Sequence, residues 1–386
     1  MSELGDTVAI LHDLISYPTV SAWSNLEMIA YLAERLERAG ARVALIQDES
    51  GLKANLFATL GPETDGGIVL SGHTDVVPVE DQDWSSDPFE LYETDGYLYG
   101  RGTCDMKGFI AAALAMAPHF AERGLTRPLH FAFTYDEEVG CIGAQQLVRE
   151  LKDREIRPEI AIIGEPTSMQ IVEGHKGCHE YTTEFRGLEG HGSSPDRGVN
   201  AAEYAARYVA RLLYLREELK GRAPADSRFD PPWTTINIGK IAGGVAHNVI
   251  PSRAEVEWEM RPVQTSDASF VLNDLHDYCR DALLPAMQAV APEADIVTHI
   301  VGEVTGLEPA DENAARALVA ELTGANGADV VPFGTEAGLF QQMGMSAVLC
   351  GPGSIEQAHK ADEYVSFSQL ELCLDMLKKL GDRIAA

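Results

Sequence analysis

Residues 66–78 read GGIVLSGHTDVVP, an apolar run that ends abruptly in a histidine and an aspartate. A short apolar run bounded by glycines is typical of a strand that is buried on both faces. Three further runs have this form: LHFAFTY before Asp136, EIAIIGEP up to Glu165, and AVLCGPG near the end of the chain. They alternate with segments of helix length. The pattern predicts an α/β protein with a layered sheet.

Two helices are expected between these strands. The stretch DMKGFIAAALAMAPHFAERG, from Asp105 to Gly124, is apolar on most faces and predicts a helix packed inside the sheet domain. GAQQLVRELKDR, beginning at Gly143, predicts a more amphipathic helix.

The middle of the chain has a different pattern. HEYTTEFRG and AEVEWEMRP alternate apolar with polar residues, as antiparallel strands with one exposed face do. A long helix is expected between them from Asn200, and another around SFVLNDLHDYCRDALL. We therefore expect a smaller α+β domain, residues 178–291, inserted into a larger domain of residues 1–177 and 292–386.

Composition restricts the class of partner. The 386 residues, 45% hydrophobic and 23% charged, suit a globular protein of about two domains. A formal charge of −30, from 60 acids against 30 bases, argues against nucleic-acid binding. No basic leader precedes an apolar run, and no stretch is apolar for the ~18 residues that a bilayer requires. We expect a cytoplasmic protein with a small-molecule substrate and no membrane partner.

The six cysteines are widely spaced and include no CxxC pair, which argues against a disulfide framework and a thiolate zinc site. They are interpreted as buried thiols.

Five segments place acids or imidazoles where a strand gives way to a loop, which is where open α/β sheets build their sites. The candidate ligands in them are His73, Asp105, Glu138, Glu165 and His359. Imidazole nitrogen and carboxylate oxygen are donors that zinc, cobalt or manganese accept, and this set suffices for two metals that share an acid. Asp75, two residues after His73, is expected to hydrogen bond the other ring nitrogen.

Each residue also has an ordinary interpretation. His73 and Asp75 could be a polar loop pair, Glu137 and Glu138 a solvated pair, and Asp105 a helix N-cap. Glu165 and His359 could be polar loop residues. The adjacent acids, however, follow a strongly apolar strand, where two unpaired charges are costly unless a cation neutralises them. One could then bind metal while the other handles protons.

Taken together, the segments resemble the M20 family of metallopeptidases and deacylases over essentially the whole chain. They are GHTDVVP, GRGTCDMKG, the DEE of TYDEEVG, GEPT, GHGSSPDRGVNA, GGVAHNVIPSRAEVEWEMR, GTEAGLF and GPGSIEQAHKADEY. The resemblance implies a catalytic domain with two divalent ions, zinc or alternatively cobalt, an inserted lid or dimerisation domain, and a homodimer.

The resemblance also implies a role for each residue. His73 and Glu165 would be terminal ligands of one metal, Glu138 and His359 those of the other, and Asp105 the bridging carboxylate. Asp75 would orient the imidazole, and Glu137 would be the general base.

Other positions are implied to act on the substrate. His191 would supply an oxyanion contact from the inserted domain, although it could be a solvated loop histidine. Asn248 and Arg261 would touch the substrate, and the guanidinium suits a carboxylate; its alternative is a surface ion pair on a Glu-rich strand.

Thr335, Glu336 and Ala337 are similar to the acetylornithine deacetylase branch of the family, whereas the desuccinylase branch tends to have Ser-Asp there. An acid near the pocket suits an ammonium such as that of ornithine. The expected reaction is hydrolysis of N2-acetyl-L-ornithine in arginine biosynthesis. The alternatives are a succinyl-diaminopimelate desuccinylase, another N-acyl amino acid deacylase, or a non-catalytic binding module. A nucleotide-binding dehydrogenase is disfavoured because the chain has no GxGxxG turn.

Overall fold

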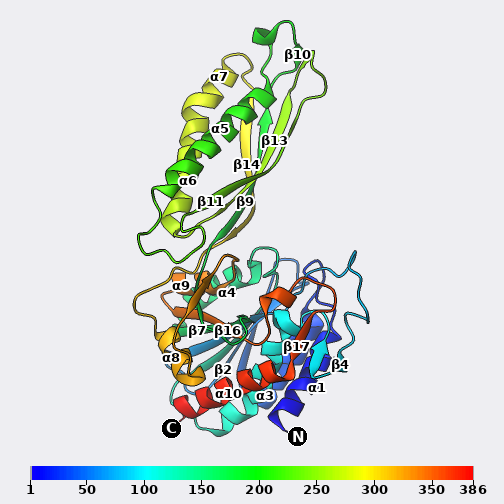
Figure 1. The fold of residues 1–386 in the computed structure, drawn as a ribbon, viewed down its shortest axis with the longest axis vertical. Helices are drawn as coiled ribbons and strands as arrows, with labels where there is room; N and C mark the ends of the chain where they lie inside the picture. The colour runs from blue at the N-terminus through cyan, green and yellow to red at the C-terminus, as the bar shows by residue number, and fades with distance from the viewer. Residues whose placement is uncertain (1, 386) are drawn as a thin grey trace. The chain divides into compact units, whose positions relative to one another are not determined.

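The computed structural model describes residues 2–385, whose contacts divide into two compact units (Figure 1). Unit 1 comprises the residues up to Gly174, Pro309–Val330, and the residues from Thr335 onward. Unit 2 comprises His175–Glu308 and Val331–Gly334. Each unit has its own hydrophobic core.

Unit 1 is built on a mixed sheet in the order β1-β2-β6-β3-β7-β16-β8-β15. Its strands are β1 (Arg42–Gln47), β2 (Ala54–Leu60), β3 (Ile68–His73), β6 (Leu129–Thr134), β7 (Ile160–Pro166), β8 (Val172–His175), β15 (Asp329–Val331) and β16 (Ser346–Gly351). β3, β6, β7 and β16 are the four strands expected from the apolar runs. The pairings of β3 with β6, β3 with β7 and β16 with β7 are parallel. The α/β fold is confirmed.

Unit 1 also contains helices and a second, smaller sheet. The helices are α1 (Glu3–Ile15), α2 (Leu26–Arg38), α3 (Gly108–Glu122), α4 (Ile142–Asp153), α8 (Ala314–Thr323), α9 (Ala337–Gln342) and α10 (Phe367–Ile384). A small antiparallel sheet in the order β17-β5-β4 consists of β4 (Tyr92–Thr94), β5 (Tyr97–Tyr99) and β17 (Tyr364–Ser366).

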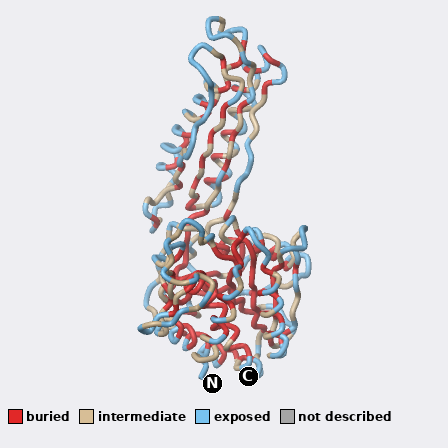
Figure 2. Tube along the Cα trace, turned by 90° about the vertical axis from the view of Figure 1, so that its right-hand side faces the viewer, coloured by how far each residue is buried: buried red, intermediate tan, exposed pale blue. Residues whose placement is uncertain are grey.

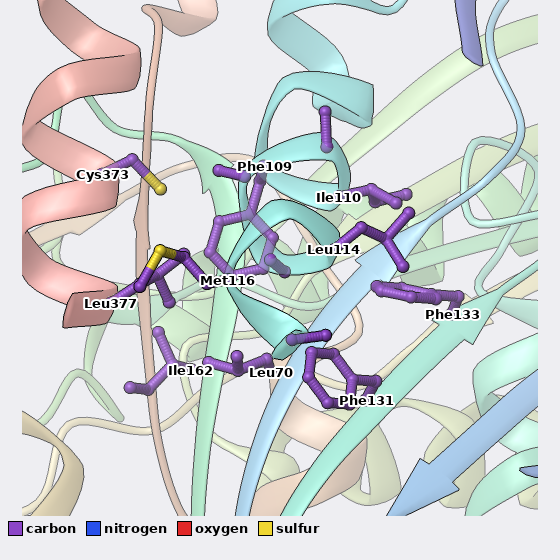
Figure 3. Close-up of a cluster of buried hydrophobic side chains, with 14 of the residues drawn as sticks. Leu70, Phe109, Ile110, Leu114, Met116, Phe131, Phe133, Ile162, Cys373 and Leu377 are labelled. Atoms are coloured by element: carbon purple, nitrogen blue, oxygen red, sulfur yellow. The ribbon is translucent and has the colours of Figure 1, made fainter. Parts of the chain in front are cut away.

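Helix α3 is apolar on most faces because it is covered on more than one side. Figure 3 shows Phe109 and Met116 of this helix close to Cys373 and Leu377 of α10. Leu70 of β3 lies in the same cluster, and all of these side chains belong to one core. The expectation of an internal helix is met, and the core holds the start of α3 against the sheet.

Unit 2 is an antiparallel four-stranded sheet in the order β11-β13-β9-β14 with helices on one face. The strands are β9 (Cys178–Arg186), β11 (Thr235–Gly243), β13 (Arg253–Arg261) and β14 (Asp295–Val304); the helices are α5 (Ala201–Lys220), α6 (Thr265–Tyr278) and α7 (Leu284–Gln288). Buried and partly exposed residues alternate along β13. Figure 2 shows buried residues interspersed with more exposed ones in the strands of unit 2. This is the one-sided burial that the alternating sequence predicts.

Unit 2 extends further along the chain than the expected 178–291. Asp295–Val304 form β14, which pairs with β9 from Arg186 to Cys178 and completes the sheet. The strand's pattern is weakly alternating, so it gave no clear sign of which domain it would join. The division between units therefore falls after Glu308.

The six cysteines, all within residues 2–385, form no disulfide bond; Cys178 and Cys279 are partly exposed and the other four are buried. Among residues 2–385, no helix combines the length and the apolar character that crossing a membrane requires.

Candidate metal centre

Three neighbouring parallel strands of unit 1 end at one edge of the sheet. His73 is the last residue of β3, and Glu165 is the penultimate residue of β7. Glu137 and Glu138 follow β6 in the loop before α4. Because the carboxyl ends of parallel strands coincide, side chains distant in the sequence meet here.

The first group of candidate ligands is His73, Asp105 and Glu165, all of them buried. His73 Nε2 lies 3.0 Å from Asp105 Oδ1 and 3.9 Å from Glu165 Oε1. The Nδ1 atom of His73 lies 2.9 Å from the backbone carbonyl oxygen of Asp75. Since a carbonyl oxygen can only accept, Nδ1 carries the proton of that bond and Nε2 is the ligand atom.

The second group is Asp105, Glu138 and His359. His359 Nε2 lies 3.0 Å from Glu138 Oε2 and 3.4 Å from Asp105 Oδ2. Asp105 thus presents a different oxygen to each imidazole. The structure therefore brings all five predicted ligands together, with the acid predicted to bridge standing between the two groups.

Asp105 lies in a π-helical turn, Thr103–Lys107, that leads into α3. Its own φ and ψ of −121° and 90° are not helical. The residue at the N-cap of α3 is Lys107, which makes no side-chain capping bond. The interpretation of Asp105 as a helix cap is therefore wrong, and its carboxylate is directed to the histidines instead.

The electrostatics of this cluster fit a pair of divalent cations. Burial, and then the neighbouring charge of Asp105, raise the pKa of Glu165 well above its usual range. Burial and Asp105 likewise raise the pKa of Glu138. Hydrogen bonds to Asp105 and Glu138 raise the pKa of His359 to about 10. These three shifts share one cause, a concentration of negative charge in a buried site, and two divalent cations would offset that charge. The donors, imidazole nitrogen and carboxylate oxygen, suit zinc or cobalt.

Asp75 is placed differently from the sequence expectation. Its carboxylate Oδ1 lies 3.7 Å from His73 Nδ1, too far for a hydrogen bond, and its backbone carbonyl makes that bond instead. The carboxylate accepts hydrogen bonds from the backbone N–H groups of Glu137 at 3.0 Å and Glu138 at 3.3 Å. Ser21 Oγ donates a further bond at 2.7 Å. Asp75 therefore holds the imidazole through its backbone and the two acids through its side chain.

Glu137 belongs to neither ligand group. Burial raises its pKa well above the usual range, and the negative charges of Glu138 and Asp105 add to the effect, although His73 opposes it. Cys141 Sγ lies 3.5 Å from its Oε1, within the loop that leads into α4. A carboxyl group beside the ligands, but not among them, can exchange protons with a substrate.

Glu336 is fully enclosed in unit 1, at 0% exposure. Its carboxylate accepts hydrogen bonds from Ser71 Oγ at 2.6 Å and Thr134 Oγ1 at 2.7 Å, so both oxygens are occupied. Ser71 and Thr134 lie in β3 and β6, and Thr134 is the register partner of His73. Thr335 is also buried, and its hydroxyl accepts from Ala337 N.

His191 and Asn248 meet at one end of unit 2. His191 pairs with Val249 between the short strands β10 (Gly190–His191) and β12 (Val249–Ile250), and Gly192 N donates to Asn248 O at 2.8 Å. Both residues are exposed. The Nδ1 of His191 lies 2.8 Å from Ser193 Oγ.

Arg261 ends β13 in unit 2, where its guanidinium is paired with Glu259 at 2.8 Å. This is the surface ion pair weighed as its alternative. A third group whose ligand atoms are close enough to hold a metal ion consists of Cys178, Glu180 and Glu259. The carboxylate of Glu259, however, is already paired with Arg261.

Sequence reasoning missed Glu363, although the segment that contains it, GSIEQAHKADEY, was singled out for His359. Glu363 is buried and paired with Arg101 at 2.7 Å, whereas its neighbour Asp362 bonds Ser85 on the exposed surface. An alternating pattern could have told which of two adjacent acids turns inward, but the loop has none.

The chain is similar to known peptidases and to a deacetylase over most of its length. The model of Peptidase family M20/M25/M40 matches residues 69–383. The acetylornithine deacetylase of Shigella sonnei (strain Ss046) is 38% identical over 372 residues, which cover 94% of each chain.

Solved structures share the fold at lower identity. An M20 family metallo-carboxypeptidase from Sulfolobus solfataricus, 18% identical, covers 97% of this chain and 98% of its own with a TM-score of 0.72. The YXEP protein of Bacillus subtilis, described as a dinuclear metal-binding peptidase of the M20 family, is 18% identical, with coverage of 100% and 99% and a TM-score of 0.65. A family model that matches most of the chain and a close full-length relative show that this protein belongs to Peptidase family M20/M25/M40 and is a hydrolase.

Proposed function

We propose that this chain hydrolyses the amide bond of N2-acetyl-L-ornithine, giving L-ornithine and acetate, and so serves arginine biosynthesis. The observation that carries the proposal is Asp105, whose two oxygens lie 3.0 Å from His73 Nε2 and 3.4 Å from His359 Nε2. The choice of substrate is supported by the 38% identical acetylornithine deacetylase, which matches nearly the whole chain.

The residues that would hold the metals divide into two sets with Asp105 in common. His73 and Glu165 complete one set, and Glu138 and His359 complete the other. Two divalent ions bound there, zinc or alternatively cobalt, would polarise the scissile carbonyl and make water more acidic. Asp75 keeps His73 in one tautomer and Glu137 in place through the contacts already described.

Glu137 is the acid that moves protons in this proposal. Its carboxylate takes a proton from the attacking water and then delivers it to the nitrogen of the departing amine, so one residue acts first as base and then as acid. It can do so because it is not one of the ligands and lies in the same loop as Glu138.

Recognition of the amino acid is assigned to the residues that the family resemblance implies. Arg261 would bind the α-carboxylate through its planar guanidinium, exchanging Glu259 for the substrate. Asn248 would also contact the substrate, and His191 would supply an oxyanion contact. Glu336, with Thr335, would favour a cationic side chain through its negative charge. Because its oxygens are occupied by hydroxyl groups, Glu336 acts through the electrostatic field or through those hydroxyls.

The test is a substrate panel with apo-protein reloaded with zinc or cobalt. N-acetylornithine, N-succinyl-diaminopimelate and N-acetylmethionine would be compared by kcat/KM, with metal-free protein as the blank. We expect the acetylated ornithine to be preferred and the metal-free blank to be inactive. Preference for the succinylated compound would reject the assigned substrate, and equal activity of verified metal-free protein would reject the mechanism.

A further inference from the structure

The carboxylate of Glu363 is turned into unit 1, where the residue is 1% exposed, four positions after His359. Its Oε1 accepts hydrogen bonds from the backbone N–H groups of Cys104 at 2.9 Å and Asp105 at 3.0 Å. Its Oε2 accepts from Gly102 N at 3.0 Å and Arg101 Nη1 at 2.7 Å. One side chain therefore accepts from three backbone amides of the 102–105 loop, including that of Asp105 itself.

The same network reaches the loop that carries His359. Arg101, itself 1% exposed, donates to Lys360 O at 3.3 Å and to the side-chain oxygen of Gln82. Gln82 Nε2 donates in turn to His359 O at 3.0 Å. Glu363 thus contacts the backbone of Asp105, and Arg101 contacts the backbone of Lys360, the residue after His359.

Only an ionised carboxylate suits this position. Four donors converge on two oxygens, and a carboxylate accepts at both of them without offering a donor of its own. An amide would turn an NH₂ group toward two of these donors in either orientation, and it would leave the guanidinium of Arg101 buried without an opposite charge. The charge of Glu363 therefore serves the loop, not the ligand groups, to which it does not belong.

We propose that Glu363, balanced by Arg101, is a positioning residue that sets the spacing of Asp105 and His359 and thereby the affinity of the centre for metal. The inference rests on the proposed metal-dependent function. Partners that orient metal ligands typically change metal affinity or activity by about 10–100-fold when they are replaced.

The experiment titrates Zn²⁺ into metal-free full-length protein in competition with a fluorescent chelator, for wild type, E363Q and E363D. We expect E363Q to bind Zn²⁺ about 10–100-fold more weakly and to lower kcat more than it raises KM. E363D keeps the charge but is one methylene shorter, so it should recover part of the loss. The absorption bands of bound Co²⁺ should shift in E363Q, because the ligand geometry changes.

The matched control is E173Q. Glu173 is an equally buried acid of unit 1, at 3% exposure, and it pairs with Arg316. It belongs to neither candidate ligand group of this unit. We expect E173Q to lower thermal stability while Zn²⁺ affinity stays at the wild-type value.

Folded E363Q that binds Zn²⁺ with wild-type stoichiometry and affinity would overturn the role of Glu363 and leave the metal centre standing. If E363Q does not fold, E363D decides the matter by the same criterion. Wild-type protein that takes up no Zn²⁺ would reject the metal centre itself, and the positioning role with it.

Discussion

At the scale of single residues, the centre separates acids that hold a cation from one that is free to move protons. Asp105, Glu138 and Glu165 each fall in a ligand group, whereas Glu137 falls in none. The same separation distinguishes two neighbours in sequence, Glu137 and Glu138, whose backbone N–H groups are held by the one carboxylate of Asp75. Which acid does which task follows from the direction of each side chain.

This separation predicts that E137Q abolishes turnover and keeps the metal. Glutamine fills the same space but cannot accept the proton, so kcat should fall by about 10²–10⁴-fold. Metal content, measured by atomic emission on the purified protein, should remain close to wild type. E138Q, a ligand variant, should instead lose metal, and E150Q, at a partly exposed position of α4, should change neither quantity. Wild-type kcat in E137Q would contradict the role of the general base.

At the scale of the elements, α3 and β7 approach so closely that only glycine fits between them. A Cβ added to Gly164 of β7 would lie 1.9 Å from Cγ of Phe109, a buried residue of α3. Glu165 follows Gly164 directly, and Asp105 lies in the Thr103–Lys107 turn that leads into α3. The contact therefore supports two ligands at once.

We predict that Gly164→Ala destabilises the protein by about 1–3 kcal/mol, because an added methyl group in a packed core forces backbone and side chains apart. Denaturant unfolding would measure the change. Gly327→Ala is the control, since a Cβ there meets nothing within 4 Å, and it should leave stability nearly unchanged. Equal stabilities of the two variants would show that α3 and β7 can move apart without lowering the free energy of unfolding.

At the scale of the whole molecule, the five candidate ligands lie in unit 1, whereas His191, Asn248 and Arg261 lie in unit 2. Within unit 1 the chain leaves and returns at neighbouring points, because a Cβ on Gly174 would lie 2.6 Å from Cγ of Pro309. Each unit also has a separate core. Residues 175–308 can therefore be replaced by a short Gly-Ser linker without stretching unit 1.

We predict that this shortened chain folds and binds Zn²⁺, as judged by circular dichroism and metal titration, but turns over substrate at a severely reduced rate. Binding survives because the ligands remain, and turnover falls because the substrate contacts assigned to unit 2 are gone. The triple variant H191A/N248A/R261A in the full-length chain is the companion, and it should be similarly slow. A shortened chain with the wild-type rate would show that unit 2 contributes nothing to turnover.

The sequence by itself determined the elements and the candidate ligands. Apolar runs before His73, Asp136 and Glu165 predict the central strands, and the alternating segments predict the sheet of unit 2. Both predictions succeed because the burial of a strand's faces determines the pattern of apolar residues within that strand. The order of histidines and acids after those runs indicated the five ligands and the resemblance to the M20 family.

Only the tertiary structure decided contacts between residues remote in the chain. Glu363 bonds Arg101 across 262 positions, and Glu336 bonds Ser71 across 265. Asp75 contacts the acids with its carboxylate and the imidazole with its backbone, and β14 joins the sheet of unit 2 through β9. Local pattern cannot specify such contacts, because the direction in which a loop side chain turns is decided by the donors that other segments bring to it.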